Sequence, residues 1–269
     1  MDNPSTFDYD SLRAAYSGVV FSISNDLTFW QTFLPAAIQA HREKYPQQTR
    51  FFESGLVAYN INLSDNKRWL HVLGPSAKIT KDNLEASRER FFMWIQLLSI
   101  VRIYIALELL LYGIIKTRYL PPAKEQQRQR KLKTLILTEL KKEAVPHETK
   151  NNAFLLAYLG HRSPSLSRFF SLPVPNLSLS RTAFFEFLSL IRHIIVHDAM
   201  LVSRNNHNLL KSRYSEFMDW YFLVEPTDRQ EKKLLFNDKL GGMQNLLGVC
   251  NDLAYNSIKF AFDLEAINA

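Results

Sequence analysis

The chain has little cysteine and little glycine. One cysteine, Cys250, among 269 residues excludes an intramolecular disulfide and a zinc site built from cysteines. The eight glycines form neither a glycine-rich phosphate-binding loop nor a Gly-x-Ser-x-Gly elbow. Cys250 lies in an apolar stretch of helical period, which is typical of a core residue. These absences argue against disulfide-stabilised secreted domains, P-loop nucleotide hydrolases and α/β-hydrolases.

The chain also offers little that would direct it to a membrane or to secretion. Its first ten residues, MDNPSTFDYD, are acidic and lack the basic and apolar regions of a signal peptide. The segment 91–115 is long enough to span a bilayer, but Gln96, Arg102 and Glu108 interrupt it at depths where charges are costly. We therefore expect a buried core helix, no membrane partner and a cytoplasmic protein.

The composition is that of a folded protein with an anionic partner. Hydrophobic residues make up 46% of the chain and aromatic residues 13%, while the net charge is +7. Basic residues concentrate in 123–143, which is predicted to be a helix. A solvated face is the plainer interpretation of this segment, and an RNA-binding face is the alternative. The candidates for RNA contact are Arg128, Arg130, Lys131 and Lys133.

The apolar pattern predicts a mainly α fold with one β-hairpin. Residues 7–45 are predicted to be helical with a break at 24–26, and 55–63 and 68–73 to form the hairpin. Gly74-Pro75-Ser76 indicates a domain edge near residue 78. An accessory segment 1–78 then precedes a helical bundle 79–269. Further helices are expected at 81–119, 151–159, 184–202, 211–223, 226–239 and 242–262, and 163–180 is expected to be a loop.

The helix predicted at 184–202 carries the residues best suited to catalysis. At about 100° per residue most of its apolar side chains fall on one side. Arg192, His193 and His197 fall on the opposite arc with Glu186, and the apolar Phe185, Val196 and Met200 lie among them. Arginine offers a permanent forked charge that matches phosphate oxygens, and imidazole suits proton transfer near neutral pH. A carboxylate such as Glu186 can orient an imidazole. Asp198 falls in the apolar arc and is expected to need a polar partner.

The spacing of the two histidines also has a metal-binding interpretation. His193 and His197 lie four residues apart, as do the zinc ligands of many metalloproteases. Ile194 follows His193 where such an enzyme would have its glutamate base, and the chain contains no Glu-x-x-His pattern. We therefore expect neither a metal nor another cofactor.

The sequence RHIIVH at 192–197 resembles the Arg-polar-x3-His motif of the HEPN superfamily (higher eukaryotes and prokaryotes nucleotide-binding). The resemblance covers residues 81–269 and implies a helical bundle that dimerises, so that two motif helices form one metal-independent RNA-cleaving site. It assigns the scissile phosphate to Arg192, the polar position to His193 and proton transfer to His197. Glu108 is the best match to the acidic residue that members often carry on an earlier helix.

The resemblance implies attack by the ribose 2′-OH, which leaves a 2′,3′-cyclic phosphate and a 5′-OH end. It also implies a toxin–antitoxin or phage-defence role, with RNA as substrate, a homodimer, and a nucleotidyltransferase-like antitoxin as a possible partner protein. The alternative is a non-catalytic RNA- or protein-binding module with a degenerate motif. Such a module would use the basic segment 123–143 and the aromatic cluster 214–222, which is otherwise expected to be core.

Overall fold

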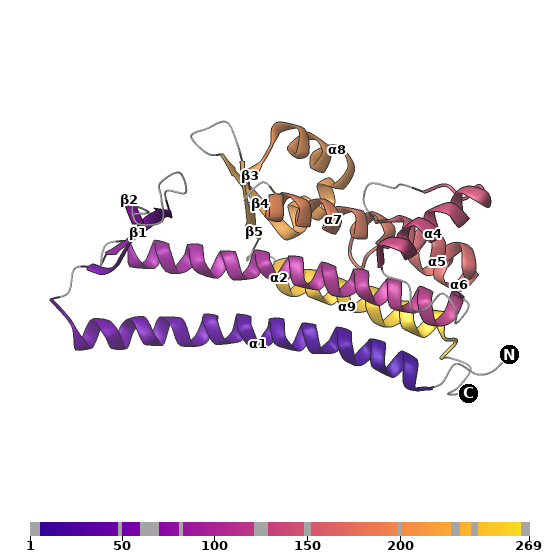
Figure 1. Ribbon diagram of the computed structural model, residues 1–269, viewed down its shortest axis with the longest axis horizontal. Helices are drawn as coiled ribbons and strands as arrows, with labels where there is room; N and C mark the ends of the chain where they lie inside the picture. Colours follow the sequence, from indigo (N-terminus) through magenta and orange to yellow (C-terminus); the bar gives the residue numbers. More distant parts are fainter. Residues whose placement is uncertain are drawn as a thin grey trace. The chain divides into compact units, whose positions relative to one another are not determined.

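The protein is mainly α-helical, as predicted, and its chain divides into two compact units (Figure 1). The computed structural model describes residues 6–47, 50–59, 70–80, 83–120, 129–147, 152–197, 201–226, 232–237 and 242–264. One unit comprises residues 25–95, and the other comprises 1–24 with 96–269. This division differs from the predicted edge near residue 78, because helices α1 (Thr6–Lys44) and α2 (Leu84–Ile114) each run through both units.

The unit 25–95 contains the predicted hairpin. Strand β1 (Arg50–Tyr59) pairs antiparallel with β2 (Leu70–Thr80). The Gly-Pro-Ser sequence that indicated a domain edge instead lies inside β2, where Gly55 is opposite Pro75 and the register shifts. Proline is tolerated there because a two-stranded sheet has only edge strands and an irregular pairing does not need its missing N–H.

Helix α1 does not break at residues 24–26, contrary to the prediction. It continues from Thr6 to Lys44, and Ser24 and Asn25 are exposed on its surface. A polar side chain ends a helix only when it caps a free backbone group, and solvated ones are compatible with continuing turns. The predicted break is therefore wrong, because these polar residues face solvent on one long helix.

The larger unit is built from α-helices with one small sheet. Its helices, beside the parts of α1 and α2 that belong to it, are α4 (Gln129–Lys142), α5 (Phe154–Arg162), α6 (Pro164–Ser171), α7 (Arg181–His197), α8 (Arg204–Tyr221) and α9 (Gly242–Ala261). After Ile114, helix α2 ends in a π-helical turn, Ile115–Tyr119. Helix α9 runs beside this end of α2, where Arg118 Nε donates to the Ala261 carbonyl at 3.1 Å (Figure 1).

Helix α2 and its π-helical turn are long and apolar enough to cross a membrane by length and composition alone. However, 61% of the most apolar window is buried inside the fold. Leu97, Ile100, Ile103 and Leu107 are fully buried, as expected of a core helix. The burial favours the predicted core helix over a membrane span.

Helix α7 packs its apolar face on aromatic residues of α8. Between ring centroids, Phe217 of α8 lies 5.5 Å from Phe184 and 5.3 Å from Phe187. All three phenylalanines of α7, Phe184, Phe185 and Phe187, are fully buried. Tyr214 and Tyr221 are buried too, which confirms these members of the aromatic cluster as core residues.

A three-stranded antiparallel sheet was missed from the sequence. Its order is β3 (Leu201–Val202), β5 (Lys232–Phe236) and β4 (Phe222–Pro226). The predicted helix at 226–239 is therefore wrong, because 232–236 is a strand. Short apolar runs of five residues do not distinguish a strand from one or two helical turns. The cross-strand pair Phe222 and Phe236, whose rings lie 4.9 Å apart, packs this sheet against the core.

The predicted loop 163–180 contains a helix, α6. Ser163 caps it by accepting a hydrogen bond from the Leu166 backbone N–H at 3.4 Å, and Pro164 occupies its first turn. A Ser-Pro pair is a start signal for a helix, so the sequence held the information. Because α6 buries Phe169 and Phe170, it is part of the core rather than a loop.

Two glycines of α9 give a matched test of this packing. A Cβ on Gly242 would lie 2.6 Å from the Tyr221 carbonyl oxygen, whereas one on Gly248 would meet nothing within 4 Å. We expect Gly242→Ala to lower the free energy of unfolding by about 1–3 kcal/mol, because backbone must move. Gly248→Ala should raise it by about 0.5–1 kcal/mol through helix propensity. Urea unfolding measures both, and equal shifts would contradict this packing.

Candidate functional site

Helix α7 is held in place at its first residue. Arg181 is buried, and its guanidinium forms an ion pair with Asp252 of α9 at 2.7 Å. The same guanidinium donates to the Pro173 carbonyl at 2.7 Å and lies 4.6 Å from the Phe169 ring centroid. The sequence analysis did not identify Arg181. Its bonds fix the start of the helix whose other end carries Arg192, His193 and His197.

The two histidines lie beside each other on the surface of α7. His193 and His197 are both exposed, and their ring centroids are 4.7 Å apart. Among the described residues neither imidazole has a hydrogen-bond partner. Both side chains are therefore open to a ligand, as acid–base groups must be.

Arg192 is only half-exposed, and its Nε is buried without a hydrogen-bond partner in the described part of the chain. Its positive charge acts on Glu108 and Tyr104 of α2. An anionic ligand at the exposed part of the guanidinium would supply acceptors and a compensating charge. The Nε end of the Arg192 guanidinium is therefore buried in the fold, while its charge remains accessible from solvent.

Glu108 lies at the centre of a polar cluster that joins α2, α4 and α7. The Asn152 amide donates to Glu108 Oε1 at 3.1 Å and to the Tyr104 hydroxyl at 3.3 Å. Tyr104 in turn donates to Ser189 of α7 at 3.2 Å, and Lys133 of α4 donates to Asn152 Oδ1 at 3.4 Å. The structure thus brings Glu108 and Arg192 into one electrostatic cluster.

Burial dominates the electrostatics of the cluster. Removal from water raises the pKa of Glu108 above its ordinary value, although the charges of Arg192 and Lys133 oppose the shift. Burial likewise raises the pKa of Tyr104, which keeps its hydroxyl protonated and able to donate. The folded protein therefore holds a carboxyl group that is costly to ionise next to the motif arginine.

Asn152, like Tyr104 and Ser189, belongs to the cluster but was not predicted from the sequence as a site residue. Its backbone has φ 50°, in the left-handed region where asparagine and glycine are favoured. This conformation, just before α5, turns the amide toward Glu108 and Tyr104. An asparagine before an apolar helix is a turn signal, but nothing in the sequence indicates which distant side chains it meets.

The remaining candidates divide between the site and the surface. Lys133 is half-buried and also lies 5.3 Å from the Phe154 ring centroid, so it belongs to the cluster rather than to an exposed basic face. Arg130 and Lys131 are exposed on α4, as an RNA-binding face would require. Arg128 and Asp198 lie outside the described residues.

Glu186 contacts α8 instead of the two imidazoles. Its Oε2 accepts from the Tyr214 hydroxyl at 2.9 Å and from Arg213 at 3.4 Å. This carboxylate was expected to orient His193 or His197, and the structure does not show that contact. Within the described residues, no group of three or more histidine, cysteine, aspartate or glutamate side chains is placed to hold a metal ion.

Comparisons with protein-family models, with curated proteins and with solved structures found no match. Any assignment of function therefore depends on the residues of this chain and on their geometry.

The raised pKa of Glu108 gives a testable pH dependence. Because the folded state binds this proton more tightly than the unfolded chain, Glu108 lowers stability as the pH rises above the ordinary carboxyl value of about 4.3. Glu108→Gln keeps an acceptor for Asn152 but removes the ionisation. We expect the variant to gain stability relative to wild type between pH 4 and pH 7, measured by urea unfolding. A relative loss over the same interval would show that the charge is stabilising.

Proposed function

We propose that this protein is a metal-independent endoribonuclease of the HEPN type. The observation that carries the proposal is Arg192, a guanidinium with a buried unpaired N–H, on the same polar arc as the exposed His193 and His197. One helix thus presents a phosphate-binding charge and two acid–base groups. This combination suits acid–base cleavage of a phosphodiester.

In the proposed reaction Arg192 binds the scissile phosphate and neutralises its developing charge. The ribose 2′-oxygen attacks phosphorus, the bond from phosphorus to the 5′-oxygen breaks, and a 2′,3′-cyclic phosphate and a 5′-OH end result. A base accepts the proton of the 2′-OH, and an acid gives one to the leaving 5′-oxygen. His197 takes part in this proton transfer, and His193 occupies the polar position beside the arginine.

The charge of the chain suits an RNA substrate. The net charge is +7, and the exposed Arg130 and Lys131 on α4 provide positive charge outside the Glu108 cluster. Phosphate contacts by such residues supply affinity without sequence preference and weaken as salt increases. Arg128 is a further candidate from the sequence and lies outside the described residues.

The proposed active unit is a homodimer in which two α7 helices meet. Val196 is 47% exposed between the two histidines, although it is an aliphatic residue. A second copy of α7 would cover it and bring two sets of Arg192, His193 and His197 to one cleft. The proposed setting is cytoplasmic, in a toxin–antitoxin or phage-defence system, with a nucleotidyltransferase-like antitoxin as the restraining partner.

Cleavage of single-stranded RNA in EDTA tests the nuclease proposal. We expect wild type to release 2′,3′-cyclic phosphate ends, and Arg192→Ala and His197→Ala each to slow cleavage by about 10²–10⁴-fold, since each removes a charge or a proton-transfer group. His207→Ala on α8 is the matched control and should retain the wild-type rate. Activity that EDTA abolishes would contradict the proposal, and RNA binding without cleavage would indicate the non-catalytic module.

Disulfide cross-linking tests the dimer. Because the one native cysteine, Cys250, is buried, an introduced cysteine is the only reactive thiol. We expect Val196→Cys to form a covalent dimer under mild oxidation. Leu209→Cys, which is also exposed but lies on α8, should remain monomeric on a denaturing gel. A monomeric Val196→Cys protein, or cross-linking of both variants alike, would contradict a dimer through α7.

A further inference from the structure

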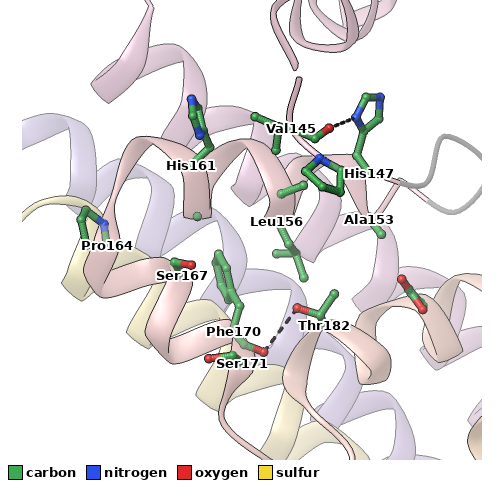
Figure 2. A pocket seen from close by; sticks show the side chains of 14 residues that line it. Val145, His147, Ala153, Leu156, His161, Pro164, Ser167, Phe170, Ser171 and Thr182 are labelled. Atoms are coloured by element: carbon green, nitrogen blue, oxygen red, sulfur yellow. Dashed lines mark hydrogen bonds between the residues drawn. The ribbon is translucent and has the colours of Figure 1, made fainter. Parts of the chain in front are cut away.

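A cleft with a volume of about 930 Å³ opens beside the N-terminal half of α7 (Figure 2). Helices α5 and α6, the segment 145–147 and α7 surround it. The volume lies at the upper end of the range of small-molecule sites. The cleft shares α7 with the proposed active site, since Glu186 lines it.

The chemistry of the cleft suits a flat, uncharged, hydrogen-bonding group. Its walls combine small and apolar side chains, such as Ala157 and Leu156, with the hydroxyls of Ser167 and Ser171 and two imidazoles, His147 and His161. No lysine or arginine is among the lining residues. A phosphate group would therefore find no permanent charge there, whereas a nucleobase can stack on imidazole and bond to hydroxyls.

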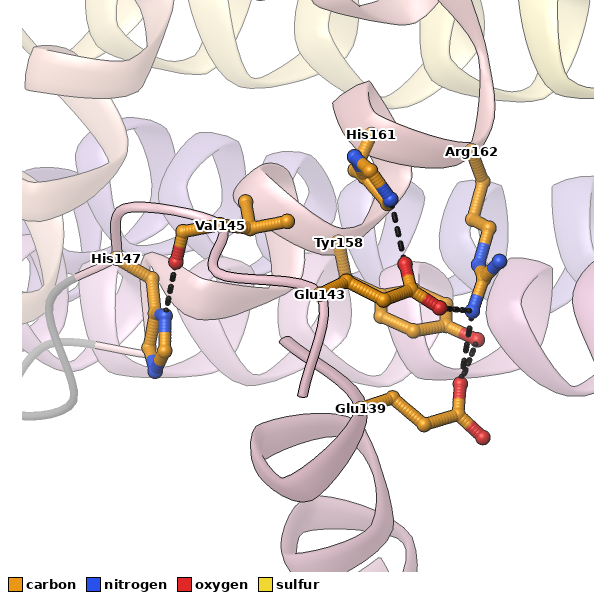
Figure 3. Close-up of polar contacts among 7 residues, drawn as sticks. All are labelled: Glu139, Glu143, Val145, His147, Tyr158, His161 and Arg162. Atoms are coloured by element: carbon orange, nitrogen blue, oxygen red, sulfur yellow. Dashed lines mark hydrogen bonds and ion pairs between the residues drawn. The ribbon is translucent and has the colours of Figure 1, made fainter. Parts of the chain in front are cut away.

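The charged residues at the rim are already paired. Arg162 forms ion pairs with Glu139 at 3.0 Å and with Glu143 at 3.2 Å, and Glu143 also binds His161 (Figure 3). The Tyr158 hydroxyl donates to Glu139 at 2.9 Å. These contacts hold the His161 ring at the edge of the cleft and leave Arg162 little capacity for a ligand phosphate.

Glu186 offers the cleft a hydrogen-bond acceptor. Both of its protein contacts, with Tyr214 and Arg213, involve Oε2, and Oε1 has no partner among the described residues. The side chain is only 13% exposed. An acceptor held in this way favours an exocyclic amino group over uracil, whose one base N–H, at N3, lies between two carbonyl oxygens that repel a carboxylate.

We propose that the cleft binds a nucleobase of the RNA substrate and that Glu186 selects bases with an exocyclic amino group, adenine, cytosine or guanine, over uracil. The proposal rests on the proposed ribonuclease function. Glu186 precedes His193 by seven residues, about 10 Å along the helix and on the same face. A strand whose scissile phosphate lies at Arg192 can therefore place a neighbouring base in the cleft.

Binding and cleavage by the full-length protein test this base selection. The probes are fluorescent oligouridylates that carry adenine, cytosine, guanine or uracil at one central position, and binding is measured by anisotropy in the inactive His197→Ala background. We expect a five- to tenfold preference for the amino-bearing bases, about the value of one hydrogen bond. Glu186→Gln, which adds a donor, should reduce this preference to twofold or less.

Tyr214→Phe is the matched control. It removes the hydrogen bond to Glu186 Oε2 but leaves the carboxylate in the cleft, so the base preference should persist. Equal affinity for all four probes in the starting protein would overturn the proposal, and so would an equal loss of preference in both variants. If wild type cleaves no RNA but the base preference and its dependence on Glu186 hold, the ribonuclease proposal fails while the cleft proposal stands.

Discussion

The burial of the apolar face of α7 is the constraint on which the candidate site depends. Phe184, Phe187 and Ile191 are fully buried, and the two phenylalanines lie against the ring of Phe217 in α8. Truncating such a side chain typically costs about 3–5 kcal/mol, so the helix cannot rotate about its axis without losing much of the stability of the fold. The rotation that buries these residues leaves His193 and His197 at the surface. The position of the polar residues is thus a consequence of core packing.

A second constraint comes from partly buried charge. Glu108 loses hydration in the core, which its raised pKa reflects, and nearby positive charge compensates only in part. The compensating groups come from separate helices: Lys133 from α4 and Arg192 from α7, with Asn152 bonded to both Glu108 and Lys133. Such a cluster contributes little to net stability, but it restricts where a guanidinium can lie. The charge of Arg192 offsets part of the cost of burying Glu108, so the two side chains are coupled electrostatically.

Features that depend on helical period could be predicted from the sequence. Features that depend on tertiary contacts could not. The polar arc of α7 and the buried face of α2 follow from the 3.6-residue repeat, and both are as expected. The resemblance suggested Glu108, but no periodicity could show that Asn152 reaches it from before α5. Lys133 was grouped with surface lysines because sequence does not distinguish an ammonium that bonds inward from one in solvent. Strands β4 and β5 were missed because their pairing partner defines them more than their own residues do.

The polar side chains along α7 differ in how many bonds they make to neighbouring helices. This difference determines the order in which a ligand lying along the helix would meet them. At the first turns Glu186 is tied to α8, one turn later Ser189 accepts from Tyr104, and Arg192 follows with its charge near Glu108. Beyond it His193 and His197 are exposed. A polymer lying along this face would meet a fixed acceptor, then a fixed cation, then two free imidazoles. In the proposed reaction, substrate recognition therefore involves side chains that are bonded to neighbours, and proton transfer involves imidazoles that are not, because a group that must exchange protons cannot be bound on all sides.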